Sequence, residues 1–123
     1  MIKTKSLSEP ISQEDGYRIL VTRYRPRGVK KEEETWNEWD KSLAPSKELH
    51  AAWYGKHGLK KIDWIEYKRR YISEMKNQKD RIGHCAIQSK NRTITLLCFC
   101  KDESRCHRIL LKDLIEKACK VGL

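Results

Sequence analysis

Two stretches of the chain have the apolar pattern of strands that are buried on both faces. Residues 93–100 form an almost unbroken apolar run with β-branched residues at its start, too short for an isolated helix and too apolar for an exposed strand. Such a run is typical of a strand in a parallel sheet that is covered by helices. Residues 17–24, which contain the sequence Ile-Leu-Val-Thr, have the same character. We therefore predict two buried strands, and a short edge strand over residues 2–6, where apolar and polar positions alternate weakly.

Helical spacing of apolar residues predicts the remaining elements, because side chains three or four positions apart share one face of a helix. Trp36 and Trp39 lie on one such stripe, in a segment with acidic residues in its first turn. The predicted helices cover residues 32–43, a short segment capped by Ser46, a longer segment beginning at Asp63, residues 81–88 and a last segment that carries Leu110, Leu114 and Ala118. A chain of 123 residues can bury one modest core. The expected fold is therefore one small α/β domain over residues 1–123, with a short, mainly parallel sheet flanked by about five helices.

The composition narrows the classes of partner. Lys and Arg outnumber Asp and Glu by 27 to 17, which gives a formal net charge of +10. This balance favours a polyanionic partner, although a need for solubility gives the same balance. The chain has no apolar segment long enough to cross a membrane, and its first residues lack the apolar core of a signal peptide. Its five cysteines, an odd number, are then expected to be reduced thiols of a cytoplasmic protein.

Charged and nucleophilic residues gather directly after the two predicted buried strands. Residues 100–108 hold two thiols, one imidazole and two guanidinium groups, and residues 23–31 hold five basic residues. Because the carboxyl ends of parallel strands meet at one edge of a sheet, we expect both segments to border the same cleft. Helix N-termini also offer free N–H groups to anions. The predicted ligand is nucleic acid or a phosphorylated small molecule, bound by Arg23, Arg25, Arg27, Arg105 and Arg108.

The order of several short motifs resembles a known family. Residues 10–28, residues 43–49, a helix from Trp64 to Tyr71 and the sequence Thr-Leu-Leu-Cys at 95–98 are similar to the family called domain of unknown function 488 (DUF488), in particular to its YeaO-like branch. The Cys-His-Arg sequence at 106–108 is similar to a motif of another branch. The resemblance implies a small cytosolic α/β protein and no established reaction. Thr22 and Arg25 depart from the family pattern, which usually has Asp and Trp at these positions.

Nucleophilic catalysis by a thiol is an alternative to simple anion binding. Cys106 is expected at a helix N-terminus beside His107 and two arginines, conditions that lower the pKa of a thiol and give a thiolate at neutral pH. Cys100 is the second candidate, because Arg105 follows it by five positions, a spacing similar to that of sulfurtransferase loops and one short of that of tyrosine phosphatases. Cys85, Cys98 and Cys119 are expected to be buried, unreactive thiols.

A soft-metal site is the third alternative. Cys98 and Cys100 are two positions apart on a strand and share a face, so that they could bind zinc together with Cys106 and His107. The spacing differs from that of the common zinc modules, and the first two cysteines lie in an apolar run. The leading interpretation is therefore a protein without a bound metal or other cofactor.

Overall fold

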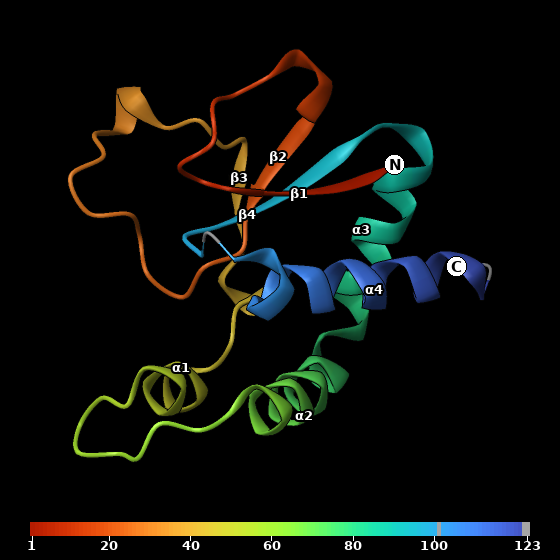
Figure 1. Ribbon diagram of the computed structural model, residues 1–123. Coiled ribbons are helices and arrows are strands. Elements are labelled where there is room, and N and C mark those ends of the chain that lie inside the picture. Colours follow the sequence, from red (N-terminus) through yellow and green to blue (C-terminus); the bar gives the residue numbers. More distant parts are fainter. Residues whose placement is uncertain (101, 122–123) are drawn as a thin grey trace.

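The computed structural model describes residues 1–100 and 102–121, and their centre is a four-stranded parallel sheet (Figure 1). Its strands are β1 (Ile2–Ser6), β2 (Tyr17–Leu20), β3 (Glu38–Trp39) and β4 (Ile94–Cys98), in the order β1-β4-β2-β3. All three strand pairs are parallel. The α/β class, the parallel sheet and the edge position of the first strand are thus confirmed.

The central strand, β4, explains why its sequence is so apolar. Its first residue, Ile94, lies beside Ile2 of β1 on one side and beside Tyr17 of β2 on the other. Every residue of β4 is buried, because neighbouring strands cover both of its edges and other segments cover both of its faces. The strand β2 ends at Leu20, earlier than predicted, and the Thr22 hydroxyl donates a hydrogen bond to the carbonyl oxygen of Tyr24 in the turn that follows.

Four α-helices are described: α1 (Lys47–Tyr54), α2 (Trp64–Met75), α3 (Lys79–Asn91) and α4 (His107–Lys120). Ser46 caps α1 as predicted, since its hydroxyl accepts a hydrogen bond from the amide of Leu49. Asp63 caps α2 in the same way, through the amide of Glu66. The segment predicted as 81–88 is part of the longer helix α3.

The predicted helix over residues 32–43 is wrong. The segment contains two short 3₁₀ turns (Lys31–Glu33 and Lys41–Leu43) on either side of the edge strand β3. The exposed edge of β2 offers backbone groups, and the amide of Asp40 donates to the carbonyl oxygen of Leu20. The indole N–H of Trp39 donates to the carbonyl oxygen of Thr22 at 2.8 Å. Pairing with the sheet therefore overrides the helical spacing of the two tryptophans.

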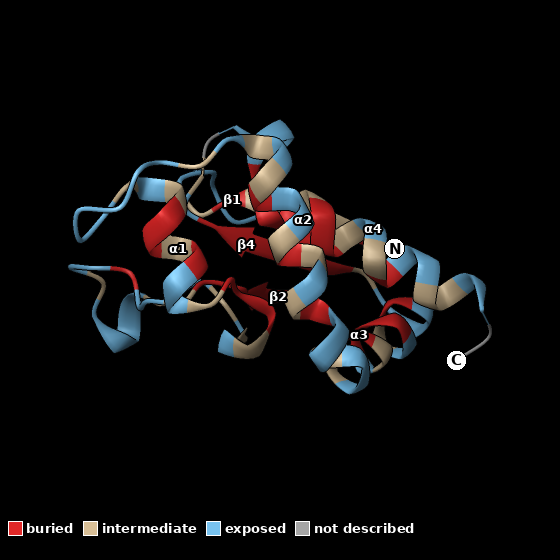
Figure 2. Ribbon diagram, turned by 90° about the horizontal axis from the view of Figure 1, so that it is seen from below, coloured by how far each residue is buried: buried red, intermediate tan, exposed pale blue. Residues whose placement is uncertain are grey.

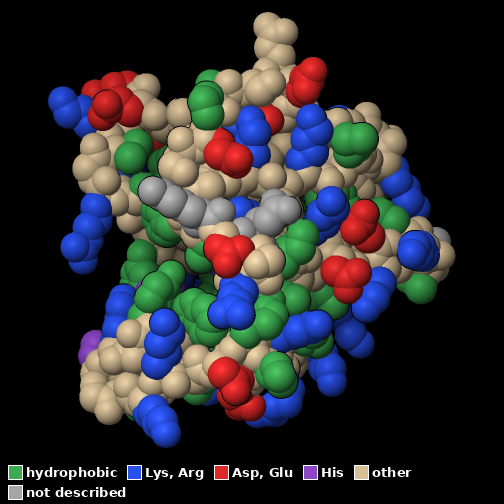
Figure 3. All heavy atoms as spheres, viewed as in Figure 1, with side chains coloured by type: hydrophobic (Ala, Val, Ile, Leu, Met, Phe, Trp, Pro, Cys, Tyr) green, Lys and Arg blue, Asp and Glu red, His purple; other side chains and the backbone are tan. Residues whose placement is uncertain are grey.

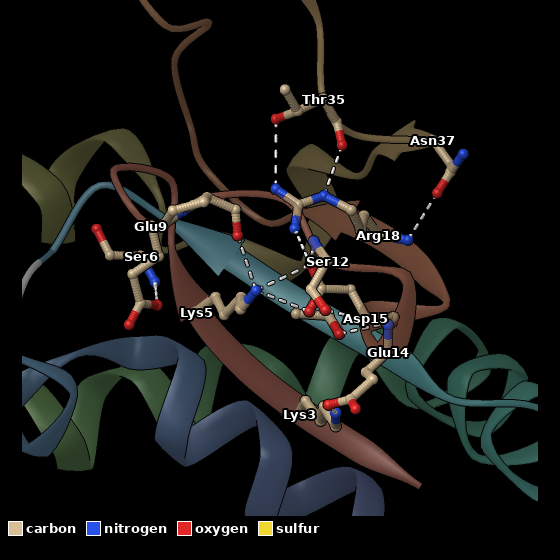
Figure 4. A network of polar contacts seen from close by, with 12 residues as sticks. Lys3, Lys5, Ser6, Glu9, Ser12, Glu14, Asp15, Arg18, Thr35 and Asn37 are labelled. Carbon is tan, nitrogen blue, oxygen red and sulfur yellow. Dashed lines mark hydrogen bonds and ion pairs between the residues drawn. The ribbon is translucent and has the colours of Figure 1, made fainter.

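The two faces of the sheet are covered differently. In Figure 1, α1, α2 and α4 lie below the sheet, and the segment of residues 7–16 passes above it. The helix side carries the hydrophobic core, which Figure 2 shows as buried strands and buried inner helix surfaces. The other side carries a network of charged side chains around Asp15 and Arg18 (Figure 4). Within the described residues, none of the helices has the length and apolar character that crossing a membrane requires.

Candidate active site

The candidate site lies at the carboxyl edge of the sheet, where β2 and β4 end, α4 begins and α1 faces them (Figure 1). These segments enclose a cavity that we call the thiol pocket. About 40 Å³ of it is open to the centres of water molecules, enough for an ion or a few waters. The lining includes residues from β4 and the start of α4 (Cys98, Phe99, Cys100, Arg105, Cys106, His107), from the segment after β2 (Thr22, Arg23, Tyr24) and from α1 and α2 (His50, Trp53, Tyr54, Tyr67).

Three cysteines meet at the base of the thiol pocket. The sulfur atoms of Cys98, Cys100 and Cys106 all lie within 4.8 Å of one another, and those of Cys98 and Cys106 are 2.7 Å apart. Cys98 and Cys100 are two positions apart at the end of β4, and the turn Glu103–Arg105 returns the chain so that Cys106 lies next to them. The side chains of Cys98 and Cys106 are buried, whereas that of Cys100 is only partly buried. Cys98 therefore belongs to a cluster of three thiols and is not an isolated core thiol.

Arg108 is the cation of this cluster. Its side chain is buried, and its Nη1 lies 2.9 Å from the sulfur of Cys98, 3.6 Å from that of Cys106 and 2.6 Å from the carbonyl oxygen of Cys100. Side chains in the first turn of a helix point back toward its N-terminus, so that Arg108 reaches the end of β4. Its Nε atom has no hydrogen-bond partner, and no carboxylate among the described side chains forms an ion pair with it. The neighbouring sulfur atoms are therefore the groups that could balance the positive charge of Arg108 by losing a proton.

The protonation of the three thiols is coupled. Hydrogen bonds to Cys100 and Cys98, together with burial, hold the pKa of Cys106 well above its ordinary value. A hydrogen bond to Cys100 raises the pKa of Cys98 to about 11. Hydrogen bonds from Cys106 and Cys98 lower the pKa of Cys100 to about 2, against the opposing effect of burial. These pKa directions do not support the predicted thiolate at Cys106: burial and its thiol neighbours favour the protonated form of Cys106, whereas the lowered pKa is that of Cys100.

The two histidines of the thiol pocket are neutral at pH 7, because burial lowers the pKa of both His50 and His107. The Nε2 atom of His107 lies 2.6 Å from the carbonyl oxygen of Val21, so it carries the hydrogen and donates. The Nδ1 atom then has a free lone pair, 3.8 Å from the sulfur of Cys106. Burial and the nearby Cys100 raise the pKa of Tyr54 to about 12, so its hydroxyl remains a donor at neutral pH.

The predicted anion-binding arginines fall into three positions. Arg23 and Arg105 line the thiol pocket, and the Nε of Arg23 donates to the carbonyl oxygen of Pro45. Arg25 and Arg27 line a neighbouring open groove. Arg25 is also paired with Glu34 at 2.6 Å. Arg108 lies behind the sulfur atoms, where it contacts them and not the cavity.

Sequence reasoning missed the contribution of α1 to this site. His50, Trp53 and Tyr54 line the thiol pocket from α1, opposite the end of β4. Their spacing of three and four positions places them on one helix face. Nothing in the local sequence shows that this face extends from the core to the carboxyl edge of the sheet.

The fold and the site define a class of protein: a small parallel α/β domain with a thiol cluster at the carboxyl edge of its sheet. The family model described as "Active DUF488-N3 subclade" (DUF488-N3a) matches residues 2–119. The chain belongs to this DUF488 family, as its motifs predicted.

Its relatives extend over almost the whole chain. It is 35% identical over 112 residues to the uncharacterized protein YeaO of Escherichia coli, a match that covers 91% of this chain and 94% of the relative. It is 28% identical over 114 residues to the uncharacterized protein Rv3073c of Mycobacterium tuberculosis, which covers 93% of this chain and 92% of the relative. No solved structure matches the chain significantly.

Proposed function

We propose that this protein is a thiol-dependent enzyme in which Cys100 is the nucleophile and the substrate carries an anionic group, such as the phosphate of a small molecule or of nucleic acid. The observation that carries the proposal is the buried guanidinium of Arg108, which contacts the sulfur atoms of Cys98 and Cys106 and the carbonyl oxygen of Cys100. A buried charge without an opposite charge is costly, because it loses its hydration. A thiolate in the cluster balances the charge of Arg108 and is at the same time the reactive form of cysteine.

Cys100 is the member of the cluster from which this thiolate can react. Its side chain is partly buried and lines the thiol pocket, whereas Cys98 and Cys106 are almost completely buried. Arg23 and Arg105 line the same pocket and would bind the anionic group, since guanidinium groups bind two oxygens at once. The neutral imidazole of His50 can accept a proton there, and the hydroxyl of Tyr54 can donate one.

Two reaction classes fit this arrangement. In sulfur transfer, the thiolate attacks the outer sulfur of thiosulfate or of a thiosulfonate, a persulfide forms on Cys100, and sulfite or a sulfinate anion, respectively, leaves beside the arginines. In phosphoryl transfer, the thiolate attacks phosphorus, a thiophosphate forms on Cys100, and the departing alkoxide takes a proton. Both are covalent catalysis, in which one difficult step is replaced by two easier ones.

Competing alkylation with a neutral and an anionic reagent tests the proposal. Cys100 is expected to react at pH 7 faster than the other four cysteines, as followed by peptide mass spectrometry. The positive charge of Arg105 should favour iodoacetate over iodoacetamide at Cys100, and Arg105→Ala should lower that preference. Lys79→Ala, which removes an exposed cation at the start of α3, is the matched control and should change neither rate. Equal rates at all five cysteines would rule out nucleophilic catalysis by this cluster.

A soft-metal site is the second candidate, because three sulfur ligands lie within 4.8 Å of one another. Three thiolates around a divalent ion carry a net charge of −1, which Arg108 would offset. The geometry brings together the three cysteines of the predicted set, while His107 has its Nε2 engaged with Val21 and only its Nδ1 free. Metal analysis of the purified protein distinguishes the two candidates. The metal site is favoured if the protein holds one equivalent of zinc and its cysteines alkylate slowly, and if a chelator both removes the zinc and makes alkylation faster.

A further inference from the structure

An open groove beside the thiol pocket gathers exposed aromatic side chains. In the part of the chain that the structure describes, three Phe, Tyr or Trp residues are exposed: Tyr24 (46%), Tyr54 (50%) and Phe99 (45%). All three line this groove, which we call the aromatic groove, with an open volume of about 680 Å³. Figure 3 shows hydrophobic side chains gathered between the upper half of the molecule, with the sheet, and the lower half, with α1 and α2. Exposed aromatic rings that cluster in one place mark an interaction site.

The charges of the aromatic groove are of one sign. Arg25, Arg27 and Lys56 line it, and no acidic residue is among its described lining residues. The ammonium group of Lys56 lies 5.7 Å from the ring centre of Tyr24 and 5.6 Å from that of Tyr54, so the cation and the rings face the same space. Arg25 is held by Glu34, whereas Arg27 is exposed. The groove therefore offers positive charge next to exposed aromatic side chains.

We propose that the aromatic groove binds single-stranded nucleic acid, with bases stacked on Tyr24, Tyr54 or Phe99 and phosphates beside Arg27 and Lys56. Rings and cations in alternation along one groove are the usual means of holding an unpaired strand, because every base has a face that can stack. The bases of a duplex stack on one another and cannot reach the rings. The charge of +10 fits the same polyanionic partner.

This inference names the substrate class of the proposed thiol enzyme and rests on that function for its catalytic meaning. The aromatic groove and the thiol pocket share Tyr24, His50, Tyr54 and Phe99 as lining residues. A strand in the aromatic groove would therefore have its neighbouring nucleotide at the mouth of the pocket that holds Cys100. Its sugar-phosphate or its base would be the group that the thiolate meets.

Fluorescence anisotropy with a labelled single strand of about a dozen nucleotides tests the binding separately from the chemistry, since such lengths fill one to three binding sites of this kind. The Cys100→Ser protein is used so that no reaction interferes. Tyr54→Leu should weaken binding about tenfold without a change in its salt dependence, because stacking releases no counterions. Arg27→Ala should weaken binding and reduce the slope of log affinity against log salt concentration by about 0.7, the value for one phosphate contact of a single strand. Lys79→Ala, far along the chain at the start of α3, should leave affinity and slope close to those of the parent.

Several outcomes would overturn the inference. Equal affinity for a duplex of the same sequence would show that stacking plays no part. Losses of the same size for Lys79→Ala and Arg27→Ala would show non-specific attraction to a basic protein. If the protein binds the single strand but its thiols are unreactive, the nucleic-acid site is supported and the proposed catalysis is ruled out. If Cys100 is reactive but no strand binds, the catalysis is supported and the nucleic-acid site is ruled out.

Discussion

Two arginine side chains are buried against the sheet, and their partners differ in kind. Arg18 of β2 has an exposed fraction of 2%, and it is paired with the buried carboxylate of Asp15 and donates to the carbonyl oxygen of Thr35 at 2.6 Å (Figure 4). Arg108 of α4, equally buried, contacts two thiols and a carbonyl oxygen, and its Nε has no partner. The partner of Arg18, the carboxylate of Asp15, is negatively charged at neutral pH. Arg108 has partners that are charged only if they lose a proton.

This difference separates a structural ion pair from a chemical one. Asp15 also accepts from Lys5 and from the amide of Ser12, so that the segment before β2 is fastened over the sheet. Burial opposes ionisation of Asp15, but these bonds and Arg18 together hold its pKa below the ordinary value. Arg108 instead stabilises a charge on groups that are neutral in ordinary surroundings. The first arrangement contributes to the cohesion of the fold, whereas a cation beside ionisable thiols favours their charged, reactive form.

The largest effect is expected from Asp15→Ala, which leaves Arg18 buried without its carboxylate. Breaking a buried pair in this way costs about 3–5 kcal/mol of unfolding free energy. Urea denaturation measures the loss. Glu14→Ala removes the adjacent but exposed carboxylate, 3.9 Å from Lys3, and should change the stability by less than about 1 kcal/mol. Equal losses for the two variants would contradict the role assigned to the Asp15–Arg18 pair.

The next effect is on reactivity. Arg108→Met removes the cation that contacts the sulfur atoms of Cys98 and Cys106, which in turn hydrogen-bond Cys100, so alkylation of Cys100 at pH 7 should slow by about tenfold or more. The stability should fall by only about 1–2 kcal/mol, because at neutral pH a thiolate that loses its cation takes up a proton far more readily than a carboxylate does. Arg18→Met should show the opposite pattern, with a larger loss of stability and unchanged alkylation. If both variants alkylate like the parent, Arg108 has no part in activating the thiols.

A smaller effect is expected on how the unfolding free energy depends on pH in acid. The pKa of Asp15 in the folded protein lies below the ordinary value of 3.8, so its contribution to stability is complete above that pH and is lost as the pH falls further. The unfolding free energy of Asp15→Asn should therefore depend less steeply on pH than that of the parent below pH 4, as measured by urea denaturation at a series of pH values. Parallel curves for the two proteins would show that Asp15 titrates normally.

The smallest effect is expected from Tyr54→Phe. The hydroxyl of Tyr54 is protonated at neutral pH and lowers the pKa of Cys100 by donating to it. Its removal should raise the pKa of Cys100 and move the acidic limb of its alkylation rate to higher pH by about one unit, in line with one lost hydrogen bond to a charged group. The stability should barely change, since half of the side chain is exposed. An unchanged rate across the pH range would exclude this bond.

The sequence predicted the fold better than it predicted the site. Both buried strands and the caps of α1 and α2 follow from local pattern, because those residues meet the same demands in any α/β domain. The segment with Trp36 and Trp39 failed because an open strand edge, a feature of tertiary structure, decided its conformation. Arg18 and Asp15 gave no signal at all, since an isolated Arg inside an apolar run does not reveal its partner.

The site shows a similar division. The topology of a parallel sheet was enough to place residues 100–108 and the arginines after β2 at one edge. It did not predict which of three cysteines is accessible, because that depends on how the turn after β4 folds back over Cys106. The proposed nucleophile is therefore Cys100 and not Cys106, the first candidate from the sequence.

The strand order has a consequence for how the protein is made. β4 is the last strand in the chain but the central one in the sheet, between β1 and β2. Until residues 94–98 have been synthesised, β1 has no neighbouring strand, and the sheet cannot form in its final order. Two of the three cysteines in the cluster lie after β4, and the third is its last residue. A nascent chain on the ribosome thus completes its sheet and its thiol cluster almost together, so that a partly made chain carries no assembled thiol cluster.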